Sequence, residues 1–259
     1  MNEYGVDSLQ LSAGQLITQA QIDLIEYLIL KAGVYSSVPS DVNTPGFFNQ
    51  TFTTFQYVVP SIQLMKQSNK PTGVYFFSYA WSAQAAAYEA QLACDALDTW
   101  SEKPDFPIFL DWESTGNTSP PSAMGAYEAL IAAGITPTAQ IVHDVTEAWM
   151  TTLQSRGYIP GLYTGGSLAG DLFGNSFLQA KRAQGLYFWE AAYNPVGPMH
   201  DCDIWQYSDS GNLLGVVVDE NRIRDDRIWD IHPVHGLPIW LKIFIANRGE
   251  NKNGCTVLL

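Results

Sequence analysis

The sequence predicts an α/β protein built as an irregular TIM-like (β/α)5(β)3 barrel. Short apolar runs alternate with helical patterns along most of the chain, which is typical of parallel βαβ units. Eight such runs fall within one chain of 259 residues, a number that favours closure into a barrel. The last three runs follow one another with little helix between them, so the barrel is expected to be irregular. We assign residues 1–230 to the barrel domain and residues 231–259 to a C-terminal extension.

The first half of the chain contains four of the expected strands. Each is a short apolar run, and the helical patterns between them include an alanine-rich segment preceded by Ser82, a typical N-cap residue. The strands are expected at residues 4–7, 27–33, 73–79 and 107–113, and the helices at residues 19–26, 54–67 and 82–100.

The second half begins with one helix and continues with four strands. The helix is expected at residues 139–155, and the strands at residues 161–164, 186–191, 203–207 and 215–219. The extension contains an apolar run at residues 238–245 and is too short to fold alone. It is expected to pack on the barrel or to dock a partner.

Composition excludes several classes of function. Hydrophobic residues make up 46% of the chain, enough for one large core, and the net charge of −13 argues against binding nucleic acid or an anionic membrane. Three cysteines without a CxxC spacing and four scattered histidines predict no metal site, and no cofactor motif is present. We expect no signal peptide at the first residues, which lack a basic and an apolar segment, and no apolar run is long enough to span a bilayer.

The most informative feature is a pair of carboxylates at one strand end, Asp111 and Glu113. Residues two apart on a strand share a face, so the two acids are expected side by side. Two other predicted strands also contribute acids at their ends, Asp7 and Asp219. Catalytic groups of such barrels lie at the carboxyl ends of the strands. A proton donor beside an anion is what cleavage of a glycosidic bond requires.

Aromatic residues accompany these acids. Trp112 alternates with the acids and is expected to face the packing side, and Trp189 and Trp205 are also expected to be buried. The tyrosines near the predicted rim are candidates for contact with a sugar ring. They are Tyr79, Tyr163, Tyr193 and Tyr207.

A set of short blocks resembles glycoside hydrolase family 25, the Chalaropsis-type lysozymes, over residues 4–222. The blocks are residues 5–7, 73–80, 107–113, 161–163, 189–193 and 205–221. The resemblance implies cleavage of the β-1,4 bond between N-acetylmuramic acid and N-acetylglucosamine in peptidoglycan. It implies that Glu113 is the general acid/base and that Asp111 is either the nucleophile or the group that orients the substrate's acetamido group. Asp7 and Asp219 would complete the acidic rim.

The same resemblance implies a setting and leaves alternatives open. Many family members are phage-encoded, so we expect an endolysin released through a holin or a wall-degrading protein carried on the virion. In the second case the extension at residues 231–259 could contact other virion proteins. The alternatives are a non-catalytic barrel that binds wall glycan or builds a particle, and a chitinase-like N-acetylhexosaminidase.

Overall fold

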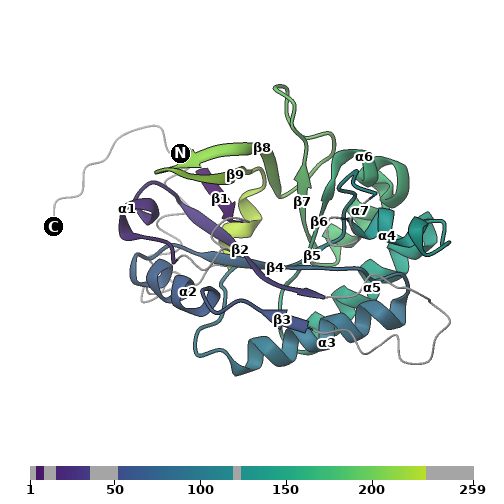
Figure 1. The fold of residues 1–259 in the computed structure, drawn as a ribbon, viewed down its shortest axis with the longest axis horizontal. Helices are drawn as coiled ribbons and strands as arrows, with labels where there is room; N and C mark the ends of the chain where they lie inside the picture. The colour runs from purple at the N-terminus through teal and green to yellow at the C-terminus, as the bar shows by residue number, and fades with distance from the viewer. Residues whose placement is uncertain (1–3, 9–15, 36–51, 119–123, 232–259) are drawn as a thin grey trace, which may run out of the picture.

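The structure is a computed structural model that describes residues 4–8, 16–35, 52–118 and 124–231. Its architecture is mixed α/β, with helices packed around the outside of a curled sheet (Figure 1). Of the extension predicted for residues 231–259, all but residue 231 lies outside the described residues. In the described ranges, no helix has the length and apolar character needed to cross a membrane.

One sheet contains all the strands of the described residues. They are β1 (Tyr4–Ser8), β2 (Tyr27–Tyr35), β3 (Phe52–Thr54), β4 (Thr72–Phe77), β5 (Ile108–Asp111), β6 (Pro160–Gly165), β7 (Tyr187–Ala191), β8 (Ile204–Leu213) and β9 (Val216–Ile223). The strand order is β1-β9-β8-β7-β6-β5-β4-β2-β3. Because β1 also pairs with β2, the sheet curls round until β1 lies between β9 and β2. The mixed α/β class is confirmed, and the (β/α)5(β)3 description stays a prediction.

Neighbouring strands are parallel from β1 through β2 and β4 to β8, whereas β9 runs antiparallel to both β8 and β1. The carboxyl ends of the parallel strands therefore meet at one end of the sheet. No helix separates β7 from β8, as the sequence predicted. The short β3 pairs antiparallel with β2 and has no counterpart among the predicted strands.

The helices agree with the sequence where its pattern is strong. They are α1 (Gln19–Ile22), α2 (Val58–Gln67), α3 (Ala83–Thr99), α4 (Ala126–Ala132), α5 (Ala139–Ser155), α6 (Gly166–Leu168), α7 (Asn175–Ala183), a π-helical segment (Ala169–Phe173) and a 3-10 helix (Asp226–Ile231). Ser82 caps α3, because its side chain accepts a hydrogen bond from the Ala85 N–H at 3.2 Å. The helix expected from residue 54 begins only at Val58, since the preceding residues form β3.

Strand alternation divides the core into two layers. On β2, Leu28 and Leu30 belong to the large cluster that packs against the helices, while Tyr27 and Ile29 belong to a second cluster. That second cluster contains the alternate residues of β4 to β7 and is rich in aromatic rings. Because successive side chains of a strand point to opposite faces, the second cluster fills the inside of the curl. It forms the floor beneath the carboxyl ends of the strands.

A buried ion cluster fastens the connection between β7 and β8. Asp203 is fully buried and accepts hydrogen bonds from Arg182 at 3.0 and 3.1 Å, from Arg227 at 2.5 and 2.7 Å, and from the Phe188 N–H at 2.7 Å. These bonds join α7, β7 and the 3-10 helix that follows β9. Helices connect other parallel strands of this sheet, whereas between β7 and β8 this cluster holds the connecting segment in place.

Replacing Asp203 by Asn is expected to destabilise the fold by about 3–5 kcal/mol, because two guanidinium groups lose their buried counter-charge. Asp201 is the matched control, since it binds the same Arg182 at 2.5 Å but its side chain is 68% exposed. Asp201→Asn should cost about 0–1 kcal/mol. Urea denaturation of both variants measures the difference, and equal losses would contradict this account of the cluster.

Candidate active site

A pocket of about 260 Å³ opens at the carboxyl ends of the parallel strands. It is lined by Lys31, Tyr75, Phe77, Asp111, Glu113, Tyr163, Trp189, Tyr193, Asp209 and Asp219. The lining residues come from β2, from every strand between β4 and β9, and from the segments that follow β5 and β7. The curl of the sheet thus brings together residues that are far apart in the sequence.

The predicted carboxylate pair lies in this pocket. Asp111 is the last residue of β5 and is 3% exposed, and Glu113 follows two residues later, half-buried. Within the described part of the chain, Asp111 Oδ1 is buried without a hydrogen-bond partner. Trp112 points the other way, into the helix-facing core, where its indole N–H donates to the Ala80 carbonyl at 2.9 Å. The expected alternation at this strand end is confirmed.

Burial changes the acidity of both groups. It raises the pKa of Glu113 to about 7, an effect that the charge of Lys31 opposes and that Asp219 and Glu128 reinforce. Burial also raises the pKa of Asp111 well above its usual range, and the charges of Glu113 and Asp219 add to the rise while Lys31 opposes it. The pair can therefore hold a proton near neutral pH.

The other predicted acids lie near this pair to different extents. Asp219, on β9, lines the pocket. Asp7 lies on β1, in register with Asp219 on one side and with Ile29 of β2 on the other. The backbone thus places Asp7 beside Asp219, and the orientation of its side chain is outside what the structure describes.

The four predicted tyrosines separate into two groups. Tyr163 and Tyr193 line the pocket, and their hydroxyls donate to Gln206 Oε1 at 2.7 and 3.3 Å. Tyr79 and Tyr207 lie outside this lining. The Tyr79 hydroxyl donates to the Met124 carbonyl at 3.2 Å, and the Tyr207 ring lies 4.8 Å from the Arg222 guanidinium.

Sequence reasoning missed several lining residues, of which Lys31 is the most important because it is the basic one. The sequence feature that could have revealed Lys31 is the alternation of β2, in which Lys31 follows Tyr27 and Ile29 on the inward face. Trp189 was expected to be buried, and it is 1% exposed, yet it also lines the pocket. Tyr75, Phe77 and Asp209 complete the missed set.

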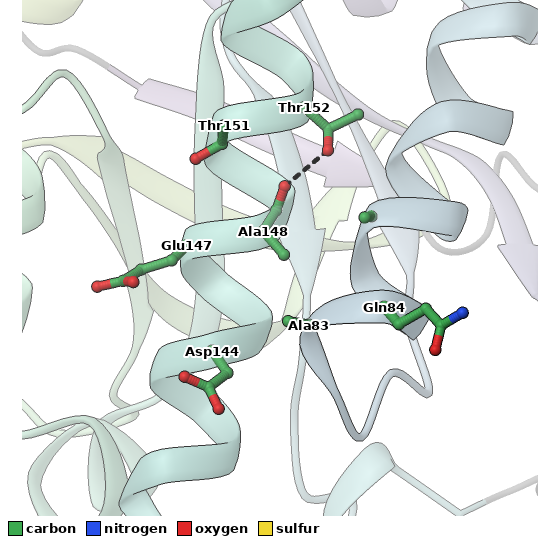
Figure 2. A pocket seen from close by; sticks show the side chains of 8 residues that line it. Ala83, Gln84, Asp144, Glu147, Ala148, Thr151 and Thr152 are labelled. Carbon is green, nitrogen blue, oxygen red and sulfur yellow. Dashed lines mark hydrogen bonds between the residues drawn. The ribbon is translucent and has the colours of Figure 1, made fainter.

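A second, more open pocket of about 470 Å³ lies on the outside of the sheet, between α3 and α5 (Figure 2). Small side chains such as Ala83 and Ala148 form its walls, together with Asp144 and Glu147 on one face of α5. It contains neither a buried carboxyl pair nor aromatic walls. In the described ranges, no cluster of His, Cys, Asp and Glu suited to a metal ion occurs in either pocket.

Paired buried carboxyls with raised pKa values, set among aromatic rings at strand ends, are the groups that a glycoside hydrolase site requires. Comparison with known families agrees with this class. Residues 51–216 match the family described as glycosyl hydrolases family 25. The chain belongs to glycosyl hydrolase family 25.

Solved structures show the same fold at low sequence identity. The modular autolysin LytC from Streptococcus pneumoniae is 16% identical with a TM-score of 0.62, over 85% of this chain and 46% of that one. The spore cortex lytic enzyme SleM from Clostridium perfringens is 17% identical with a TM-score of 0.60, over 86% and 67%. The catalytic domain of endolysin ply40 from bacteriophage P40 of Listeria monocytogenes is 15% identical with a TM-score of 0.57, over 90% and 98%. The chain thus spans less than half of LytC. No curated protein matches it.

Removing one charge from the pocket tests its electrostatics. Asp219→Asn should lower the pKa of Glu113 below about 7, because the Asp219 charge helps to raise it. A ¹³C NMR titration of the side-chain carboxyls measures the change. Asp144→Asn, in the pocket between α3 and α5, removes the same charge from a distant site and should leave the Glu113 titration in place. An unchanged Glu113 titration in Asp219→Asn would contradict the assignment.

Proposed function

We propose that this chain is a lysozyme-type muramidase that hydrolyses the β-1,4 bond between N-acetylmuramic acid and N-acetylglucosamine in peptidoglycan. The observation that carries the proposal is the buried Asp111–Glu113 pair in the pocket of a family 25 member. The aromatic walls support a carbohydrate substrate, because sugar rings pack well against tyrosine and tryptophan.

In this proposal Glu113 is the general acid/base. Its pKa of about 7 leaves it about half protonated at neutral pH and largely protonated at lower pH, so it can donate a proton to the oxygen that leaves when the glycosidic bond breaks. Asp111 stabilises the positive charge that develops on the sugar, either by direct attack or by orienting the substrate's 2-acetamido group. Glu113 then takes a proton from the water that completes hydrolysis.

The remaining predicted residues would bind and polarise the substrate. Asp219 and Asp7 would complete the acidic rim around the pair. Tyr163 and Tyr193 are suited to contact the sugar, because Gln206 holds both hydroxyls and keeps the rings in place. Tyr79 and Tyr207 lie outside the pocket lining, and we propose that they contact parts of the sugar chain that extend beyond the pocket.

The proposed setting is the bacterial cell wall. The names of the similar structures, an autolysin, a spore cortex lytic enzyme and a phage endolysin, support this setting. We further propose a phage enzyme, either an endolysin released through a holin or a wall-degrading protein of the virion. In the second case residues 231–259 would dock to other virion proteins.

Glu113→Gln should reduce turnover of purified peptidoglycan by roughly two to four orders of magnitude, because the amide cannot donate the proton. Reducing ends released per minute give the rate. Glu147→Gln on α5 is the matched control and should retain the wild-type rate, since its side chain pairs with Lys181 outside the pocket. A Glu113→Gln rate near the wild-type value would refute the role of Glu113.

The products distinguish the proposal from its alternatives. A muramidase leaves muramic acid at the new reducing end, whereas a chitinase-like N-acetylhexosaminidase leaves N-acetylglucosamine. Mass spectrometry of reduced fragments identifies the terminal sugar. Wild-type protein that binds peptidoglycan but releases no reducing ends would instead support a non-catalytic barrel.

The pH dependence is a separate prediction. In the free enzyme, kcat/KM should fall as the pH rises through about 7, because Glu113 loses the proton that it must donate. At the acid side it should fall as the second carboxyl of the Asp111–Glu113 pair takes up a proton, because no ionised group then remains beside the sugar. A rate that keeps rising above pH 8 would contradict Glu113 as the acid. Initial rates on peptidoglycan across this range give the profile.

A further inference from the structure

Lys31 is the only basic residue among the described residues that line the pocket, and the proposed reaction has not yet used it. The inward alternation of β2 places it in the middle of that strand, after Tyr27 and Ile29 and in register with Tyr75 of β4. The pairing of β2 with β4 shifts between Lys31 and Gly33. Such bulges re-aim side chains and are frequent beside active sites.

Two aromatic rings fix the position of the Lys31 ammonium. Its Nζ atom lies 4.8 Å from the centre of the Phe77 ring and 5.8 Å from the centre of the Tyr75 ring. Both distances are within the range of a cation–π interaction. Phe77 and Tyr75 line the same pocket as the acids, so they hold the charge at the pocket wall.

The titratable groups that share the pocket with this ammonium come from six strands or strand ends. They are Asp111 and Glu113 at the end of β5, Asp209 on β8, Asp219 on β9, Tyr75 on β4, Tyr163 on β6 and Tyr193 after β7. Four carboxyl groups therefore share the pocket with one cation. The charge of that cation opposes the rise that burial and neighbouring acids cause in the pKa of Asp111 and of Glu113.

We propose that Lys31 is a positioning residue that acts through the Asp111–Glu113 pair, keeping one carboxyl ionised while the other holds a proton. The effect on the rate rests on the proposed function of the pocket, whereas the effect on the carboxyls does not. The electrostatics agrees with this geometry, because the charge of Lys31 lowers the pKa of both Asp111 and Glu113 against their burial.

The reason for a lysine at this place follows from the burial of the pair. Without this cation, the pKa of both carboxyls would rise further, and Asp111 would be ionised less often to stabilise a developing positive charge. A cation in direct contact with Glu113 would have the opposite fault, since it would remove the proton that Glu113 must donate. A charge held at the wall by Phe77 and Tyr75 acts on both acids at once.

The test compares Lys31→Met with Lys31→Arg. Methionine keeps the length of the side chain and its contact with Phe77 but removes the charge, whereas arginine keeps the charge. In Lys31→Met the whole bell-shaped profile of kcat/KM on peptidoglycan should move to higher pH by on the order of one unit, so that the rate on the acid limb falls about tenfold. Lys31→Arg should keep the wild-type profile.

Lys181→Met is the matched control. Lys181 also lies over a ring, 5.4 Å from the centre of Phe177, and pairs with Glu147 at 2.6 Å, but it is on α7, away from the pocket. It changes the net charge by the same amount and should leave the profile in place. An equal shift in both methionine variants would show a general charge effect and overturn the role of Lys31.

A second readout needs no turnover. In a ¹³C NMR titration, the carboxyls of Asp111 and Glu113 should titrate at higher pH in Lys31→Met than in the wild type. If peptidoglycan is not cleaved but this shift is present, the proposed function fails and the role of Lys31 stands. If cleavage occurs and neither the profile nor the titration moves, the role of Lys31 fails alone. Should Lys31→Met not fold, Lys31→Gln replaces it and is read by the same two outcomes.

Discussion

The burial of two neighbouring carboxyl groups at the end of β5 is the constraint on which the rest of the pocket depends. An ionised carboxylate is costly in an apolar setting unless it is paired or takes up a proton. Asp111 is 3% exposed, and its Oδ1 atom has no hydrogen-bond partner among the described residues. The fold thus holds a group that binds a proton or a cationic centre strongly, which is the property that a glycosidase needs at this position.

The carboxyl end of β5 is held by backbone hydrogen bonds to the segments on both sides of it in the sheet, and α3 supports it from the helix-covered face. The Ser78 N–H donates to the Asp111 carbonyl at 2.9 Å, and the Trp112 N–H donates to the Tyr163 carbonyl at 3.1 Å. Behind them, Glu89 of α3 accepts hydrogen bonds from the Ser78 hydroxyl and the Tyr79 N–H. Burial raises the pKa of Glu89 to about 8, so it is largely protonated at neutral pH and adds no further charge behind the pair. A fixed backbone keeps the two carboxyls at one separation, as acid catalysis requires.

The parts of this arrangement that the sequence predicted are those set by local pattern. The helix at residues 139–155 and the cap at Ser82 follow from periodicity and side-chain chemistry, and both are confirmed. The alternation that separates Asp111 and Glu113 from Trp112 is also local. By contrast, β3 has only three residues and exists because it pairs with β2, which no local pattern reveals. The place of Lys31 is likewise non-local, since its neighbours in the pocket are 44 or more residues away in the chain.

The distribution of cations explains why one lysine has so much influence. The chain has 13 basic residues against 26 acidic ones, and two of its arginines, Arg182 and Arg227, are committed to the buried Asp203 beneath the β7–β8 connection. There they outweigh the effect of burial and keep the pKa of Asp203 below its usual range. The same fold therefore contains two buried carboxyl sites with opposite outcomes. Where two guanidinium groups bind one carboxylate, as at Asp203, the carboxylate stays ionised and the site has a structural role. Where one ammonium faces several carboxyls across a pocket, protons remain exchangeable, and the site can carry out acid–base chemistry.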